Sequence, residues 1–107
     1  MTKKTIMLAC AGGMSTSLLV TKMKAAAKAN DADYQIFATA AAEIRDRLTG
    51  DQRPDVLLLG PQIRYIADKT QALADQVGVP MAVINMHDYG TMNGVNVLKT
   101  AEQLIKP

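Results

Sequence analysis

The sequence predicts an α/β fold: a single domain with a four-stranded parallel sheet and helices on both of its faces. Short apolar runs alternate with longer amphipathic runs along the 107 residues, which is typical of repeated strand–helix units. No linker, repeat or low-complexity segment interrupts the alternation, so we expect one domain over residues 1–107. Apolar residues make up 49% of the chain, enough to build a core without disulfides or metals.

The expected strands are apolar runs bounded by turn residues. They cover residues 5–9, 35–39, 55–59 and 81–84. The first ("TIMLA") and the third ("DVLLL", followed by Gly60 and Pro61) are the most apolar, which places them at the centre of the sheet. With right-handed crossovers the strand order is 2-1-3-4, and the topological switch point lies between the first and third strands. Ligands of such sheets bind outside the carboxyl ends of the strands near that point.

An amphipathic stretch follows each expected strand. These stretches predict helices over residues 15–30, 41–48, 62–76 and 93–105. In the first of them, Leu18, Leu19 and Met23 recur at near-helical spacing. The second and third helices end near Gly50 and Gly78, as helices commonly do at glycine.

Charge and composition exclude several classes of protein. Twelve basic and ten acidic residues are scattered along the chain, for a net charge of +2, and there are only three Tyr, one Phe and no Trp, so we expect no nucleic-acid partner. One cysteine forms no internal disulfide, no cluster of metal ligands is evident, and a lone thiol suits the reducing cytoplasm. The apolar run after "MTKK" is too short to span a bilayer, so we expect no direct membrane insertion.

The stretch "CAGGMSTS" joins the first expected strand to the first expected helix and resembles the phosphate loop of phosphatases. Gly12 and Gly13 allow a tight path with inward N–H groups, and the helix that follows adds its own free N–H groups and its positive dipole end. Together they predict an anion-binding cup. Cys10 at the rim of this cup would be held as a thiolate, a nucleophile for phosphoryl groups.

Three other interpretations of this loop stay open. A buried cysteine at a strand end often acts only as a small hydrophobic residue, and glycine-rich turns are common without any ligand. A phosphatase or arsenate reductase of the low-molecular-weight tyrosine phosphatase kind requires arginine six residues after its cysteine, where this chain has Thr16. The first arginine is Arg45, so we expect no arginine near the loop, which favours a protein that hands the phosphoryl group on. The third interpretation is a regulatory domain that senses phosphorylation without passing the phosphoryl group on.

Three motifs make the chain similar to a known family. They are "IMLACAGGMSTSLLVTKM" (residues 6–23), "DVLLLGPQIRYI" (55–66) and "YGTMNGVNVLK" (89–99). In this order and spacing they resemble the IIB component of the bacterial sugar phosphotransferase system, of the lactose/cellobiose group. The resemblance covers essentially the whole chain and implies a four-stranded parallel sheet with flanking helices.

The resemblance also implies a function, that of a cytoplasmic phosphoryl carrier. A IIA component would donate the group from its phosphohistidine, and Cys10 would pass it to a cellobiose-, chitobiose- or lactose-like sugar held by the membrane-embedded IIC permease. The transfer needs no metal or other cofactor. Backbone amides of the loop would cradle the phosphoryl oxygens; its residues are Ala11, Gly12, Gly13, Met14, Ser15, Thr16 and Ser17.

Several residues near these motifs have two interpretations. Gln62 either belongs to a simple strand-to-helix turn or contacts the loop or a partner, and Met14 either docks partners or packs on the first helix. "INMHDYG" is expected to be a loop in which Tyr89 packs and His87 either faces solvent, which we favour, or lies near the cup as an acid or base. Asn85 and Asp88 in the same loop have no assigned role.

Overall fold

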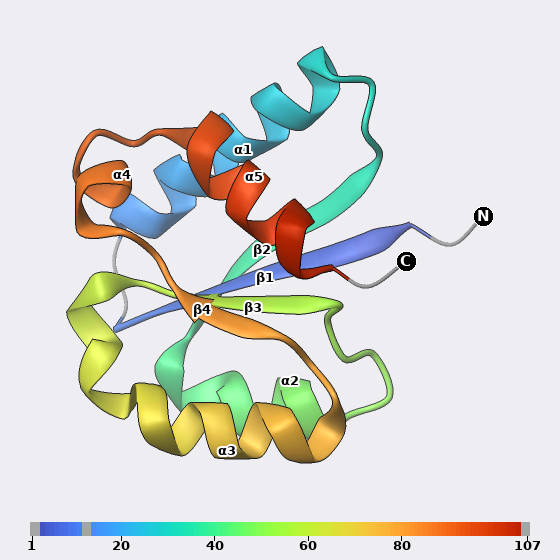
Figure 1. Cartoon of the computed structure of the whole chain (residues 1–107), viewed down its shortest axis with the longest axis vertical. Helices are drawn as coiled ribbons and strands as arrows, with labels where there is room; N and C mark the ends of the chain where they lie inside the picture. The colour runs from blue at the N-terminus through green and yellow to red at the C-terminus, as the bar shows by residue number, and fades with distance from the viewer. Residues whose placement is uncertain (1–2, 12–13, 106–107) are drawn as a thin grey trace.

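A four-stranded parallel sheet forms the middle layer of the molecule (Figure 1). The structure is a computed structural model that describes residues 3–11 and 14–105, without the side chain of Met14. The strands are β1 (Lys4–Cys10), β2 (Tyr34–Ala40), β3 (Val56–Leu59) and β4 (Met81–Val83). Their order, β2-β1-β3-β4, confirms the predicted topology. In register, Cys10 lies opposite Ala40 of β2, and Ala9 lies opposite Leu59 of β3.

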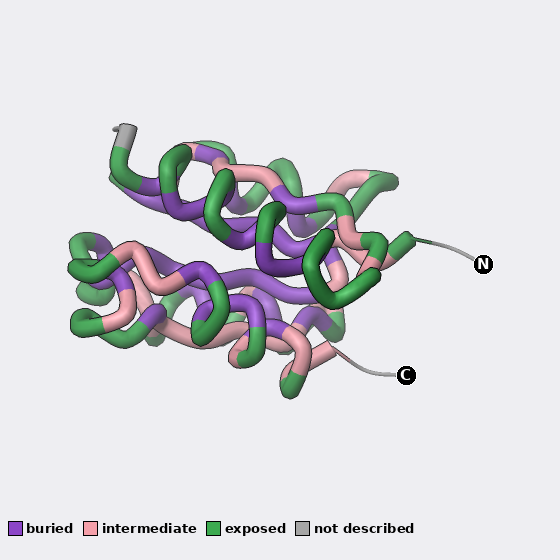
Figure 2. Tube along the Cα trace, turned by 90° about the horizontal axis from the view of Figure 1, so that it is seen from above, coloured by how far each residue is buried: buried purple, intermediate pink, exposed green. Residues whose placement is uncertain are grey.

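Helices cover both faces of the sheet, as predicted. α1 (Met14–Ala29) and α5 (Gly94–Leu104) pack together on one face, and α2 (Ile44–Thr49) and α3 (Ala67–Val77) on the other (Figure 1). Three short elements join them: η1 (Ala41–Glu43), η2 (Pro61–Ile66) and α4 (Met86–Gly90). Figure 2 shows that buried positions lie between the layers, whereas exposed positions lie on the outer sides of the helices.

The two central strands build a core on each face of the sheet. Ile6 and Leu8 of β1 belong to the cluster under α1 and α5, while Met7 and Ala9 belong to the cluster under α2 and α3. This alternation follows from the two-residue period of a strand. Both strands are fully buried over their shared length, which confirms their predicted central position.

Two elements differ from the prediction. The stretch expected as a loop after the fourth strand contains α4, whose five residues are too few to show helical periodicity. The helix expected over 62–76 begins as the 3₁₀ turn η2, and α3 starts only at Ala67. Ile63 leaves helical dihedrals there (φ −114°, ψ 23°), and its N–H bonds the Gly60 carbonyl at 3.1 Å, the three-residue spacing of a 3₁₀ turn.

At the amino end of β2, the Tyr34 hydroxyl donates to Glu102 Oε2 of α5 at 2.7 Å. This hydrogen bond, with burial and the Glu102 charge, raises the pKa of Tyr34 to about 12 from 10.0. A raised pKa means that the neutral phenol stabilises the fold below pH 10 and that this stabilisation is lost as the pH rises toward 12.

We therefore expect Tyr34→Phe to lower the free energy of unfolding by about 1 kcal/mol at pH 8. The difference between wild type and variant should shrink between pH 10 and 12. Urea unfolding of both proteins at pH 8 and pH 11 measures it. A difference that stays constant with pH would contradict the assigned hydrogen bond.

Candidate functional site

Cys10 is the last residue of β1, at the carboxyl edge of the sheet and beside the β1–β3 switch point. Its side chain is buried, with 8% of the residue exposed. On the β2 side, the thiol donates to the Thr39 carbonyl (Sγ to O, 3.9 Å). On the β3 side lies Gly60, whose N–H bonds the Ala9 carbonyl at 2.8 Å; a Cβ at Gly60 would lie 3.8 Å from the Cβ of Cys10. The thiol is thus placed where open α/β sheets bind ligands.

The loop after Cys10 leads directly into α1. Ala11 is exposed, Gly12 and Gly13 lie outside the described residues, and α1 begins at Met14. Exposed Ser15 and Ser17 follow in its first turn. The first N–H groups of any α-helix have no partner within the helix and carry its positive dipole end. The start of α1 therefore brings N–H donors and a positive potential to the loop that follows Cys10.

Thr16 has a different environment from its two serine neighbours. It is buried, and its hydroxyl shares a hydrogen bond of 3.0 Å with the hydroxyl of Tyr89 in α4. Tyr89 is buried too, which confirms its expected packing role. The contact joins α4 to the first turn of α1, and no local pattern reveals it, because 73 residues separate the partners.

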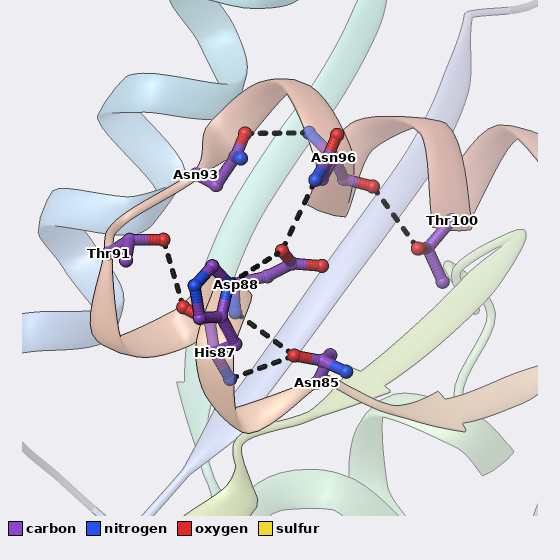
Figure 3. Close-up of polar contacts among 7 residues, drawn as sticks. All are labelled: Asn85, His87, Asp88, Thr91, Asn93, Asn96 and Thr100. Carbon is purple, nitrogen blue, oxygen red and sulfur yellow. Dashed lines mark hydrogen bonds and ion pairs between the residues drawn. The ribbon is translucent and has the colours of Figure 1, made fainter.

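A polar network holds α4 in place (Figure 3). Asn85 caps this helix, because its Oδ1 accepts from the N–H groups of His87 at 2.8 Å and Asp88 at 3.1 Å. Asp88 Oδ1 in turn accepts from Asn96 Nδ2 of α5 at 3.2 Å. The His87 side chain is 81% exposed, as expected, with Nδ1 3.9 Å from Asp88 Oδ1. Asn85 and Asp88 thus have structural roles: Asn85 caps α4, and Asp88 joins α4 to α5 by a hydrogen bond.

Removing the Tyr89 hydroxyl should be costly because it leaves the buried Thr16 hydroxyl without a partner. We expect Tyr89→Phe to lower the free energy of unfolding by about 1–2 kcal/mol. Tyr89→Phe combined with Thr16→Val removes both polar groups and should recover most of this loss. Denaturant unfolding of the single and double variants completes the cycle; additive losses would show that the two hydroxyls do not interact.

A pocket of about 240 Å³ opens beside Cys10, at the carboxyl end of β2. It is lined by Cys10, Ser17, Ala38, Thr39, Ala40, Glu43 and Arg47. The expectation that no arginine lies near the loop is therefore wrong. Arg47 is distant from Cys10 in sequence, but β2 ends beside β1. The chain then runs through η1 into α2, and Arg47 of α2 lines the pocket.

On the opposite side of Cys10, Gln62 approaches Gly60. A Cβ at Gly60 would lie 3.0 Å from Gln62 Oε1 and 3.8 Å from the Cβ of Cys10, so Gly60 borders both the Gln62 amide and Cys10. The first residues after β3 and β4 also include two exposed apolar side chains, Tyr65 (80% exposed) and Met86 (61%). Ile63, in contrast, is fully buried and packs in the core.

Comparison with known proteins gives one consistent family. Residues 5–100 match the family model "PTS system, Lactose/Cellobiose specific IIB subunit". The chain is 53% identical to the galactose-specific EIIB component of Lactococcus lactis subsp. cremoris (strain MG1363), covering 98% of this chain and 99% of the relative. The cellobiose-specific EIIB component of Lactococcus lactis subsp. lactis (strain IL1403) matches with the same identity and coverage. An oligo-beta-mannoside-specific EIIB component of Bacillus subtilis (strain 168) is 36% identical, with 95% and 96% covered.

Two solved structures share the fold. The lactose-specific IIB domain from Streptococcus pneumoniae superposes with a TM-score of 0.82 at 15% identity, covering 98% of this chain and 100% of that chain. The cellobiose-specific IIB component from Borrelia burgdorferi has a TM-score of 0.79 at 36% identity, with 97% and 93% covered.

In the part of the chain that the structure describes, no helix combines the length and apolarity that crossing a bilayer requires. The family model spans most of the chain, and the relatives align with it nearly end to end. The chain therefore belongs to the lactose/cellobiose-specific IIB subunits of the sugar phosphotransferase system, which act as protein-phosphohistidine–sugar phosphotransferases.

Proposed function

We propose that residues 1–107 form one IIB domain that accepts a phosphoryl group on Cys10 from a IIA phosphohistidine and transfers it to a sugar on a IIC permease. The position of Cys10 carries this proposal. It ends β1 at the topological switch point, borders a pocket, and is followed directly by the loop into α1. A nucleophile there meets the free N–H groups of a helix start, which bind phosphoryl oxygens.

Two substitutions at phosphorus make up the relay. In the first, the Cys10 thiolate attacks, an S–P bond forms, and the N–P bond of the phosphohistidine breaks, so that its electron pair returns to the imidazole. In the second, a sugar hydroxyl attacks, an O–P bond forms, the S–P bond breaks and the thiolate is regenerated as the hydroxyl proton is released. In both steps charge is spread over three equatorial oxygens, which backbone N–H groups of the loop would stabilise.

The loop favours relay over hydrolysis because it supplies neutral donors. The position of the phosphatase arginine is held by Thr16, whose side chain is buried against Tyr89 and is not available to clamp a phosphate. An arginine at this position would bind two phosphoryl oxygens in a fork, as phosphatases and arsenate reductases of this kind require. A low-molecular-weight phosphatase is therefore the second candidate, and hydrolysis of a simple aryl phosphate tests it.

Partners would dock at the carboxyl edge of the sheet. Docking to a IIA component would take place in the cytoplasm, and docking to a IIC permease at the inner face of the membrane. Exposed apolar side chains stand at this edge: Leu18 in α1, Tyr65 after β3 and Met86 at the start of α4. Exposed apolar side chains suit transient interfaces of small buried area with a IIA component and a IIC permease. Met14 and Gln62 are further candidates for these contacts.

The sugar is one of the β-glucoside or lactose type. The relatives' names refer to galactose, cellobiose and oligo-beta-mannosides, and we propose that the permease, which holds the sugar, selects among such substrates. Cellobiose, chitobiose, lactose and galactose are therefore the sugars to assay first.

Reconstitution of the relay tests the function. Membranes carrying a candidate IIC permease are supplied with phosphoenolpyruvate, the general phosphotransferase proteins, a IIA component and this chain. Sugar phosphate should form only when this chain is present. Phosphorylation of the chain without transfer to any sugar would indicate a regulatory domain instead, and hydrolysis of an aryl phosphate without sugar phosphorylation would indicate a phosphatase.

A further inference from the structure

The first turn of α1 is anchored by Thr16. This residue is 1% exposed, whereas its neighbours Ser15 and Ser17 are exposed to solvent. A buried hydroxyl without a partner is costly, and the Thr16 hydroxyl has its partner in the Tyr89 hydroxyl at 3.0 Å. The turn that follows the Cys10 loop is therefore fixed by a directional contact as well as by apolar packing.

Tyr89 is itself held firmly in place. It is buried in the core cluster under α1 and α5. The helix that carries it, α4, is capped by Asn85 and joined to α5 by the hydrogen bond from Asn96 to Asp88 (Figure 3). The Asn93 N–H also donates to the Asp88 carbonyl at 2.8 Å. The position of Tyr89 is therefore set by core packing together with backbone and side-chain hydrogen bonds.

The hydrogen bond between the two hydroxyls crosses the carboxyl edge of the sheet. α1 follows β1 and α4 follows β4, and β3 lies between these two strands. Figure 1 shows α4 beside the start of α1. The contact therefore fixes the start of α1 from across the edge at which Cys10 lies.

We propose that Tyr89 is a positioning residue for phosphoryl transfer at Cys10, acting through Thr16 by holding the first turn of α1 where its N–H groups bind phosphoryl oxygens. The inference rests on the proposed function, because Cys10 must carry the group. Neither hydroxyl forms a bond to phosphorus or moves a proton in the reaction. Phosphatases of the low-molecular-weight kind have a charged clamp at the position of Thr16, whereas here this position anchors a set of neutral donors.

Positioning of this kind affects the rate of transfer more than the binding of the donor protein. Fixed N–H donors stabilise the charge on the three equatorial oxygens without having to reorganise, and a displaced donor loses part of that stabilisation. The exposed apolar side chains proposed to contact partners, Leu18, Tyr65 and Met86, are unchanged when the Tyr89 hydroxyl is removed. Its loss should therefore slow transfer at saturation and leave the apparent affinity for phosphorylated IIA unchanged.

The test compares two tyrosines whose hydroxyls are both hydrogen-bonded. The Tyr89 hydroxyl bonds Thr16 at the carboxyl edge of the sheet, whereas the Tyr34 hydroxyl bonds Glu102 at the amino end of β2. Tyr89→Phe and Tyr34→Phe thus remove the same group at opposite ends of the sheet. Each variant is mixed with increasing concentrations of phosphorylated IIA in a rapid-quench experiment. Intact-protein mass spectrometry then gives the saturating rate constant of phosphorylation and the half-saturating concentration of IIA.

We expect Tyr89→Phe to lower the saturating rate constant by about tenfold and to keep the half-saturating concentration within about twofold of wild type. Tyr34→Phe should change neither quantity by more than about twofold, although it also weakens the fold. Equal rate constants for the two variants would show that the Tyr89 hydroxyl has no role beyond stability, and would overturn the proposal. A higher half-saturating concentration at an unchanged rate constant would also overturn it, because that result indicates a docking contact.

Variants of Thr16 separate positioning from folding. Thr16→Val should slow transfer as much as Tyr89→Phe does, and the double variant should be no slower than either single one, because all three lose the same contact. The double variant also recovers stability, so it tests the rate even where Tyr89→Phe folds poorly. Thr16→Ser keeps the hydroxyl and should transfer within about threefold of wild type, although it leaves a small cavity. Additive losses of rate would contradict action through Thr16.

Failure of this inference and failure of the proposed function give different results. If wild type and the variants of Tyr89 and Thr16 are all phosphorylated on Cys10 at the same rate, the positioning role is overturned and the relay stands. If wild type accepts no phosphoryl group from a competent IIA component, the proposed function fails and the positioning role fails with it.

Discussion

Replacement of Cys10 by serine is expected to lower sugar phosphorylation in the reconstituted relay by roughly three orders of magnitude. The serine hydroxyl stays protonated at neutral pH, so the attacking atom loses both its negative charge and the polarisability of sulfur. Serine fits the same space at the end of β1, where only 8% of the residue is exposed. The loss should therefore appear in transfer while the fold is kept. Radioactive sugar phosphate formed from labelled phosphoenolpyruvate measures it.

The matched control is Tyr34→Phe, which removes a hydrogen-bonded hydroxyl at the opposite end of β2. It should lower stability and leave the transfer rate within about twofold of wild type, since Tyr34 lies far from the carboxyl edge of the sheet. Comparable transfer by Cys10→Ser and wild type would show that another residue carries the phosphoryl group.

Replacement of Gly94 by alanine should cause a larger loss of stability than alanine at any other glycine that the structure describes. A Cβ at Gly94 would lie 2.5 Å from the carbonyl carbon of Lys22 and 2.7 Å from its carbonyl oxygen. These are backbone atoms in the middle of α1, so α5 itself must move away, which opens the core between the two helices. We expect the free energy of unfolding to fall by about 3 kcal/mol. Urea unfolding followed by circular dichroism measures the change.

Gly90→Ala is the control for this prediction. Gly90 ends α4, is exposed, and has no atom within 4 Å of the position that a Cβ would take. Alanine there should be neutral or stabilising by about 0.5 kcal/mol, because it restricts the unfolded chain. A Gly94→Ala protein as stable as Gly90→Ala would mean that α1 and α5 do not approach as closely as the structure places them.

The sheet was predictable because its signals are local. The continuous apolar runs of β1 and β3 indicate strands buried on both faces, which puts them in the centre and determines the order β2-β1-β3-β4. Cys10 was predictable for the same reason, since a residue that ends a central strand must lie at the carboxyl edge. Gly78 ends α3 in the left-handed conformation (φ 74°), as its position after a helical pattern indicates.

What the sequence could not show depends on contacts between distant residues. α4 is one turn long and forms because Asn85 caps it and Tyr89 reaches Thr16 across 73 residues. Arg47 is absent from the loop motif and reaches the Cys10 pocket only once β2 is paired with β1. Both features lie near Cys10. Functional sites are where local sequence patterns are expected to predict structure least well.

The central claim is that Cys10 carries the phosphoryl group, and direct mapping of that group tests it. Wild-type protein is incubated with phosphoenolpyruvate, the general phosphotransferase proteins and a competent IIA component, then measured by intact-protein mass spectrometry and peptide mapping under conditions that preserve S–P bonds. Our account predicts a gain of one phosphoryl group, located on Cys10 and absent from Cys10→Ser. A group found on any other residue, such as the exposed His87, or no gain at all, would contradict it.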